Sequence, residues 1–162
     1  MSETKTLYEE DIVAWSKQQA QALRAAARTG SNLQLDWENL AEEIEDLAVS
    51  QRSAIGSYTL RIIQHLVKLD HSPAIEPRKG WRRTIRLARL QIQRRLKDSP
   101  SLRPELSQIV EEETKLGVEY AIADLEEYGE IGEVDENAVR RSRYSPEQVL
   151  GDWFPEEPPR GE

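Results

Sequence analysis

The apolar residues between Trp37 and Leu69 recur in steps of three and four, and this long seam limits what the chain can fold into more than any other feature. The spacing is nearly a heptad repeat, which is typical of an amphipathic helix that packs against other helices. We therefore predict a helix over 36–69, roughly 50 Å long at the usual rise per residue. Gly56 is the position where this helix bends most easily. The seam consists of Trp37, Leu40, Ile44, Leu47, Ala54, Ile55, Tyr58, Ile62, Leu66 and Leu69.

Similar periodicity predicts further helices at about 7–29, 78–97, 102–128 and 145–151, with an irregular segment over 129–144. Thr6 and Glu9 form a capping-box pattern before the first of these helices, and Gly30 supplies its stop. β-Branched residues never alternate in runs, so no strand pattern competes. The sequence predicts an all-α fold, namely an up-and-down bundle of four main helices plus a short C-terminal helix. Its length is that of a single helical domain over 1–162.

The apolar stripes of the later helices predict which side chains form the core. On the helix over 78–97 the stripe comprises Trp81, Ile85, Ala88, Ile92 and Leu96. On the helix over 102–128 we expect Leu102, Leu106, Ile109, Leu116, Tyr120 and Ala123 to face inward. Trp15, Trp37 and Trp81 each lie on an apolar stripe, which favours core packing over ligand stacking.

Composition excludes several classes of site and of location. The chain has no cysteine, which removes disulfides, thiolate zinc sites and a cysteine nucleophile. No apolar run approaches the ~20 residues that span a bilayer, and no signal-peptide core is present, so we expect a cytoplasmic protein without a membrane partner. The net charge of −8 opposes non-specific binding to nucleic acid.

Seven short stretches, in this order and at this spacing, resemble one bacterial family. They are residues 7–11 (LYEED) with Trp15, 35–40 (LDWENL), 42–47 (EEIEDL), 65–68 (HLVK), 81–86 (WRRTIR), 99–103 (SPSLR) and 144–148 (YSPEQ). Together they make the chain similar to the domain-of-unknown-function family 29 over nearly its whole length. One departure is Asp70-His71, where the family more often carries an aromatic residue and a glutamine. The resemblance implies an all-α fold and no known activity.

The predicted helix over 78–97 has the most unusual charge pattern. It carries nine lysines and arginines and no acid, and Arg82, Arg83, Arg86 and Arg89 mark the candidate basic surface. One interpretation is a surface that binds nucleic acid or an acidic partner. The other, which we favour, is that acidic neighbours within the bundle neutralise the helix. Two acidic segments could do so, since 36–46 has six acids and no base, and 105–136 has twelve acids and one lysine.

One polar cluster is a candidate binding pocket. His65 falls beside the apolar seam and should be partly buried, and Lys68 follows three residues later on the same side of the helix. Asn39 and Glu43 would join them if this helix pairs with itself in a second copy. A satisfied core histidine remains the simpler interpretation of His65.

No motif in the sequence indicates catalysis, a metal or a cofactor. Bundles that bind two iron atoms place His three residues after Glu, but the residues three before His65 and His71 are Ile62 and Lys68. No phosphate-binding loop or nucleophile elbow is present. We therefore predict a non-enzymatic protein-interaction module or small regulatory partner protein, most readily a homodimer. The alternative is a nucleic-acid-associated, antitoxin-like protein that uses the arginine-rich helix.

The absence of a metal-binding pattern gives a first testable prediction. Elemental analysis of the purified protein should find no stoichiometric iron, manganese or zinc. Chelators should leave the melting temperature unchanged, because no folding energy is expected to come from a metal. One tightly held metal per chain would show that the glutamates converge in a way that their spacing does not indicate.

Overall fold

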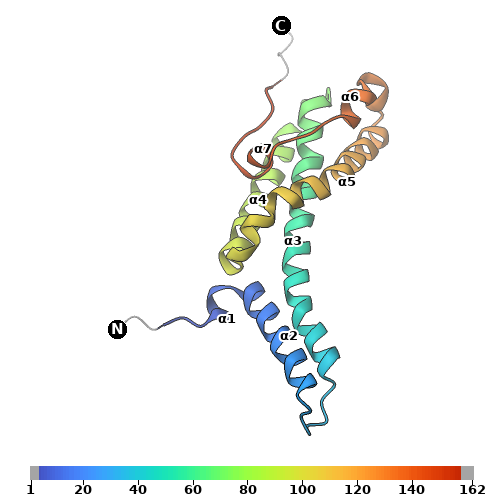
Figure 1. Cartoon of the computed structure of the whole chain (residues 1–162). Coiled ribbons are helices and arrows are strands. Elements are labelled where there is room, and N and C mark those ends of the chain that lie inside the picture. The colour runs from blue at the N-terminus through green and yellow to red at the C-terminus, as the bar shows by residue number, and fades with distance from the viewer. Residues whose placement is uncertain (1–3, 158–162) are drawn as a thin grey trace. The chain divides into compact units, whose positions relative to one another are not determined.

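The longest element is α3 (Trp37–His71), whose helical hydrogen bonding continues through Gly56 without a break. Figure 1 shows it in the computed structural model, which describes residues 4–157. Asp36 lies just before the helix, and its carboxylate accepts a hydrogen bond from the Asn39 amide at 3.3 Å. The predicted seam therefore corresponds to one helix of 35 residues, two residues longer at its C-terminal end than expected.

The described residues form helices and no strand, which confirms the all-α class with four main helices and a short C-terminal one. The main helices are α2 (Ile12–Arg28), α3, α4 (Arg78–Asp98) and α5 (Leu106–Glu127). The short elements are α1 (Leu7–Glu10), the 3-10 helices η1 (Pro100–Glu105) and η2 (Ile131–Glu133), α6 (Glu136–Arg140) and α7 (Pro146–Leu150). No helix in this part of the chain combines the length and the apolar character needed to cross a bilayer.

The chain divides into two compact units. The N-terminal unit comprises residues 1–54 with 94–104, and the C-terminal unit comprises 55–93 with 105–162. In the first unit, α2 and the beginning of α3 form a helical hairpin (Figure 1). The second unit combines the end of α3, most of α4, α5 and the short C-terminal helices. The single domain expected over 1–162 remains a prediction.

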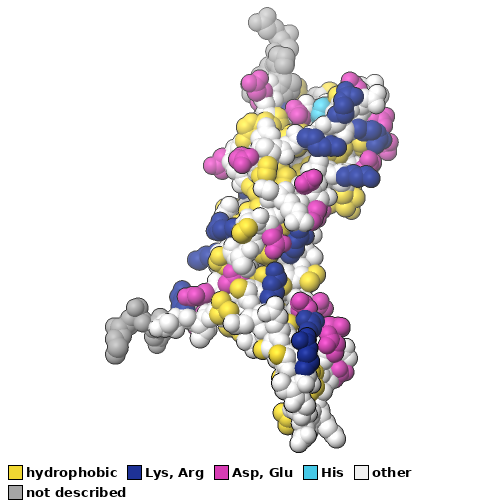
Figure 2. All heavy atoms as spheres, viewed as in Figure 1, with side chains coloured by type: hydrophobic (Ala, Val, Ile, Leu, Met, Phe, Trp, Pro, Cys, Tyr) yellow, Lys and Arg dark blue, Asp and Glu magenta, His cyan; other side chains and the backbone are white. Residues whose placement is uncertain are grey.

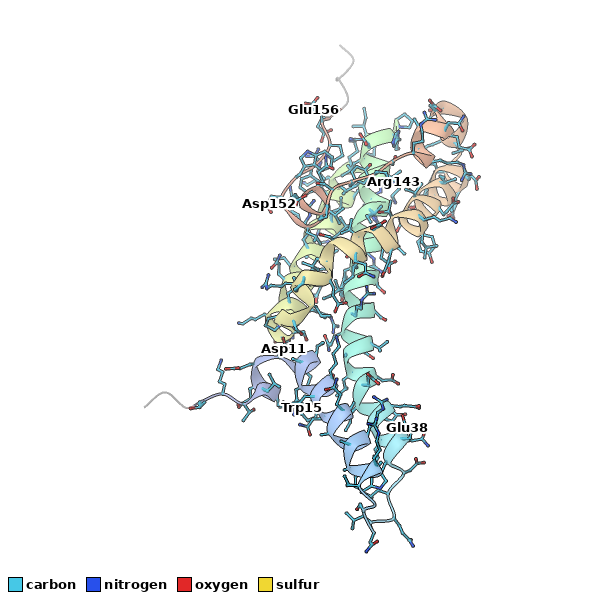
Figure 3. The ribbon with its side chains drawn as sticks, viewed as in Figure 1. Asp11, Trp15, Glu38, Arg143, Asp152 and Glu156 are labelled. Atoms are coloured by element: carbon cyan, nitrogen blue, oxygen red, sulfur yellow. The ribbon has the colours of Figure 1, made fainter. Side chains whose placement is uncertain are left out.

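The helix predicted over 7–29 is two helices, because Asp11 leaves the helical conformation with φ −156° and ψ 95°. The Asp11 carboxylate accepts a hydrogen bond from the Ala14 amide at 2.8 Å and so caps α2. It also accepts bonds from the Ser101 amide at 2.7 Å and the Ser101 hydroxyl at 2.9 Å. Figure 3 labels Asp11 and Trp15 at the start of α2. This buried carboxylate ties the start of α2 to η1, so the break in the helix stabilises the N-terminal unit.

The segment over 129–144, expected to be irregular, contains η2 and α6. Gly129 has φ +72° and reverses the chain after α5, a conformation that glycine adopts without steric cost. The Asp135 carboxylate then caps α6 by accepting a bond from the Ala138 amide at 3.1 Å. Asp135 at the N-cap is the local feature of the sequence that indicates this short helix, which is too short to show an apolar periodicity.

The buried side chains that α2 and α3 contribute to the N-terminal unit are small, and this changes the expected seam. Ala41 and Ala48 of α3 are buried, whereas Leu40 and Leu47 are 40% and 43% exposed. The buried stripe is rotated by one residue because alanine lets two helices approach more closely than leucine does. In the N-terminal part of the predicted seam, Leu40 and Leu47 therefore face outward, whereas Trp37 and Ile44 are half-buried.

In the C-terminal unit, the predicted seam is buried along α3. Ile55, Ile62 and Leu66 are fully inaccessible and Tyr58 is half-buried, so this part of the seam packs within the unit and leaves no apolar stripe exposed. The stripe of α4 is also confirmed: in this unit Ile85, Ala88 and Ile92 are buried and Trp81 is half-buried, and Leu96, which belongs to the N-terminal unit, is buried as well.

The inward face of α5 differs from the prediction. Leu116 and Tyr120 are 46% and 47% exposed, and Ala123 is exposed as well. The buried face comprises Ile109, Val110, Thr114, Gly117, Val118, Ala121, Ile122 and Leu125. Gly117 explains this choice, because a Cβ built there would lie 2.8 Å from Cγ2 of Ile63 and 3.2 Å from the Leu60 carbonyl oxygen. A small residue is needed where α5 crosses α3.

Substitution of Gly117 by alanine tests this packing. The added methyl group should overpack the α3–α5 contact and lower the free energy of unfolding by about 1–3 kcal/mol. Gly80→Ala is the matched control, because Gly80 lies in α4 with nothing within 4 Å of an added Cβ. The control should stabilise the protein by about 0.5–1 kcal/mol through helix propensity. Urea unfolding of both variants measures the difference, and equal effects would contradict the close contact.

Candidate functional site

The four residues of the predicted polar pocket fall in two units. Asn39 and Glu43 lie on the exposed side of α3 in the N-terminal unit, whereas His65 and Lys68 belong to the C-terminal unit. The Asn39 side-chain amide donates to the Asp36 carboxylate at 2.6 Å. The pocket required two copies of the helix to pair, so it remains a prediction for an assembly.

Lys68 is the centre of a polar cluster in the C-terminal unit. Its side chain is 9% exposed and forms an ion pair with Asp124 of α5 at 2.7 Å. The Gln64 amide, one turn earlier on α3, donates to the same Asp124 oxygen at 2.8 Å. The Lys68 ammonium also lies 5.0 Å from the centroid of the Trp81 ring on α4. Three helices therefore meet at one buried positive charge, which is compensated by a carboxylate and an aromatic face.

A pocket of about 600 Å³ opens beside this cluster. Its volume is in the range of small-molecule sites. It is lined by Lys68, Pro73, Ala74, Pro77, Trp81, Asp124, Tyr128, Glu130 and Glu133. Of the predicted pocket residues it contains Lys68 alone. The others could not be found from sequence spacing, because they come from the α3–α4 connection, from α4, from α5 and from the segment after α5.

The turn at Gly129 positions Glu130 and Glu133, which form the acidic wall of this pocket. The Glu130 amide donates to the Leu125 carbonyl at 2.7 Å, which closes the end of α5. The Glu130 carboxylate accepts a hydrogen bond from the Ser72 hydroxyl, just after α3. Glycine after a helix, followed by two glutamates within four residues, is the signal that could have located this wall in the sequence.

His65 is half-buried and does not line the pocket. Its ring Nδ1 lies 2.8 Å from the Arg61 carbonyl oxygen. Burial of the imidazole, together with the positive charge of Lys68, lowers the pKa of His65 to about 4. The ring is therefore neutral near pH 7, and Nδ1 donates to the carbonyl. This geometry is that of a satisfied structural histidine.

The candidate basic surface is largely occupied by the protein's own C-terminal segment. Arg89 is 7% exposed, and its guanidinium donates to the carbonyls of Val149 at 3.0 Å, Gln148 at 2.8 Å and Trp153 at 2.7 Å. The guanidinium groups of Arg82, Arg86 and Arg89 lie 5.3, 5.3 and 4.8 Å from the centroid of the Phe154 ring.

The ion pairs of α4 also lead to this segment. Arg82 forms an ion pair with Glu157, and Arg78 forms a second one with the same carboxylate at 3.3 Å. The acidic neighbour is therefore Glu157, which belongs to neither of the two acidic segments that we had considered. Of the four predicted residues, Arg83 is exposed on α4 and stands outside this set of contacts.

Two helix surfaces combine exposed leucines with charge of a single sign. On α3, Leu40 and Leu47 are flanked by Asp36, Glu43 and Asp46. We call this set the acidic face. Figure 2 shows the other side of this helix pair, where acidic side chains lie next to basic ones over the α2–α3 hairpin. On α4, Leu87 and Leu90 are 50% and 64% exposed. They follow the exposed basic residues Lys79, Arg83 and Arg86 at helical spacing. We call this set the basic face.

Comparison with known proteins identifies a family and a fold. Residues 7–154 match the sequence profile of a family described as "Domain of unknown function DUF29". A similar solved structure is that of an alpha-helical protein of unknown function from Rhodospirillum rubrum, with a TM-score of 0.67 and 24% sequence identity. The similarity covers 94% of this chain and all of that one. No curated protein matches the chain.

The depressed pKa of His65 predicts a pH dependence of stability. The unfolded histidine titrates near 6.5, so between pH 6.5 and about 4 only the unfolded chain binds this proton. The neutral His65 therefore contributes to the free energy of unfolding above pH 6.5, and this contribution is lost as the pH falls towards 4. It amounts to about 1.4 kcal/mol for each unit by which the pKa is lowered. His65→Gln should remove this part of the acid destabilisation, as measured by urea unfolding at pH 4.5 and pH 7. An NMR titration of the His65 ring with a midpoint near 6.5 would contradict the prediction.

Proposed function

Because the chain belongs to the DUF29 family of domains of unknown function, its role has to be inferred from its own surfaces, and we propose that it is a non-enzymatic protein-interaction module. The partner in this proposal is a second copy of the chain, with the acidic face of one copy on the basic face of the other. The observation that carries the proposal is the opposite charge of two leucine-bearing helix surfaces. Homo-oligomer formation was expected from the sequence, but through a different contact.

The acidic face supplies apolar contact area with a negative border. Leu33 and Leu35, in the connection before α3, are 63% and 48% exposed and add to the apolar surface that this end of the unit presents. Arg24 of α2 compensates Glu38 at 3.1 Å and Glu45 at 2.9 Å, on the other side of α3. Figure 3 labels Glu38 in the first turn of α3. These ion pairs leave Glu43 and Asp46 as the acids beside the exposed leucines.

The basic face offers the complementary surface. Leu87 lines a hollow of about 310 Å³ together with Tyr58, Arg61, Thr84, Ala88 and Gln91. A leucine side chain of a partner helix would fit into such a hollow, as helix ridges fit into grooves. Arg83 lies one turn before Leu87 and would meet a carboxylate of the acidic face.

Electrostatics favours this heterologous contact over symmetric pairing of α3. If the acidic faces of two copies met in a two-fold pair, the Glu43 and Asp46 carboxylates of each copy would face carboxylates of the other, and like charges in contact are destabilising. Contact between faces of opposite charge is attractive and speeds association. It weakens with salt, because the charges are exposed.

Light scattering at high micromolar concentration and low salt tests the proposal. The wild-type chain should give a mass above its 18.6 kDa monomer, and the mass should fall towards the monomer as salt is raised. Glu43→Lys and Arg83→Glu should each weaken association about tenfold or more, because each places like charges in contact. A mixture of the two variants should associate again, since the intact acidic face of Arg83→Glu meets the intact basic face of Glu43→Lys, and the two substituted faces also carry opposite charges.

Glu127→Lys is the control, because it changes charge equally at an exposed position of α5 outside both faces. It should leave association unchanged. A monomer at all concentrations would overturn the proposal. So would binding of duplex DNA at physiological salt that Arg83→Glu abolishes, since this outcome favours the nucleic-acid alternative.

A further inference from the structure

We infer that the pocket beside Lys68 and Asp124 binds a small organic cation, namely an ammonium group carried on an apolar stem. This inference is independent of the proposed assembly, because no residue of the acidic or basic face lines the pocket. It follows from the charge balance of the walls, from their aromatic content and from the size of the cavity.

The charge balance of the pocket is negative. Lys68 and Asp124 neutralise each other at 2.7 Å, and the Gln64 amide further occupies the Asp124 carboxylate. Glu130 and Glu133 remain, and Glu130 accepts a hydrogen bond from the neutral Ser72 hydroxyl, which leaves its charge in place. An anionic ligand would be repelled by these two carboxylates, whereas a cation would meet acceptors for charge-assisted hydrogen bonds.

The remaining walls suit the stem of such a ligand. Pro73, Ala74 and Pro77 of the α3–α4 connection provide aliphatic surface, and Trp81 and Tyr128 provide aromatic surface. The Trp81 ring already has the Lys68 ammonium 5.0 Å from its centroid. Tyr128 is 73% exposed and offers its ring at the same pocket. Aromatic rings beside carboxylates are a recurring way to bind an ammonium ion.

A cavity of about 600 Å³ holds more than a bare inorganic cation. Pockets of this size take small organic molecules and bury most of their surface. The ligand is therefore an amine with several methylene groups. A free polyamine and the side chain of a lysine share this chemistry, and the experiment below separates the two sources.

NMR titration of the full chain tests the inference. The probe resonance is the Trp81 indole N–H, assigned by its loss in Trp81→Phe. Hexylammonium should shift this resonance saturably, while hexanoate, which has the opposite charge on a similar stem, should not. Spermidine and Nα-acetyl-lysine methylamide are then compared; tighter binding of the first assigns a free polyamine, and tighter binding of the second assigns a protein side chain.

Glu133→Gln should raise the dissociation constant of hexylammonium about tenfold, because it removes a charge-assisted contact. Glu126→Gln is the matched control, since Glu126 is exposed on the opposite side of α5 from Asp124 and lies outside the pocket. It should leave the constant unchanged. Equal shifts with hexanoate and hexylammonium, no saturable shift with any amine, or equal effects of the two variants would each overturn the inference. The light-scattering result does not depend on any of these outcomes.

Discussion

The close approach of α5 to α3 at Gly117 is the constraint on which the C-terminal unit depends. With the Ile63 side chain and the Leu60 carbonyl so near, the rotation of α5 about its axis is set by the one position without a Cβ. That rotation buries Val118, Ala121 and Leu125 and directs Asp124 towards Lys68. The pocket wall and the core are therefore consequences of the same helix crossing.

Only 38% of the residues are apolar, and buried charged side chains add to the stability of the fold by bonding to the ends of helices. Arg78 is 3% exposed, and its guanidinium donates to the Leu69 carbonyl at 2.6 Å, in the last turn of α3. This carbonyl lacks a partner within its helix, so the arginine both satisfies it and complements the helix dipole. Asp11 does the equivalent at the start of α2. Each of these charges is bonded to the main chain, which compensates for its removal from water.

Periodicity predicted the existence of the main helices and most of their boundaries, because long runs of apolar residues at spacings of three and four are typical of helices alone. It was less reliable for the rotation of helices that carry two possible stripes. On α5 the larger residues Leu116 and Tyr120 indicated the wrong face. The face with Gly117 and Ala121 is buried instead, because Ile63 of α3 leaves no room for a larger side chain at position 117. The pocket could not be predicted, because Lys68, Trp81 and Asp124 come from three helices, and only their packing brings them together.

The contacts of Arg89 determine which positions of the C-terminal segment can change their side chain without losing the contact with α4. Its hydrogen bonds to this segment are accepted by main-chain carbonyls, at Gln148, Val149 and Trp153. These three hydrogen bonds do not depend on which side chains stand at positions 148, 149 and 153. Phe154 is different, because its ring lies over the guanidinium groups of Arg82, Arg86 and Arg89. Arg89 itself cannot be replaced by lysine without loss, because a lysine cannot reproduce the planar fork of donors.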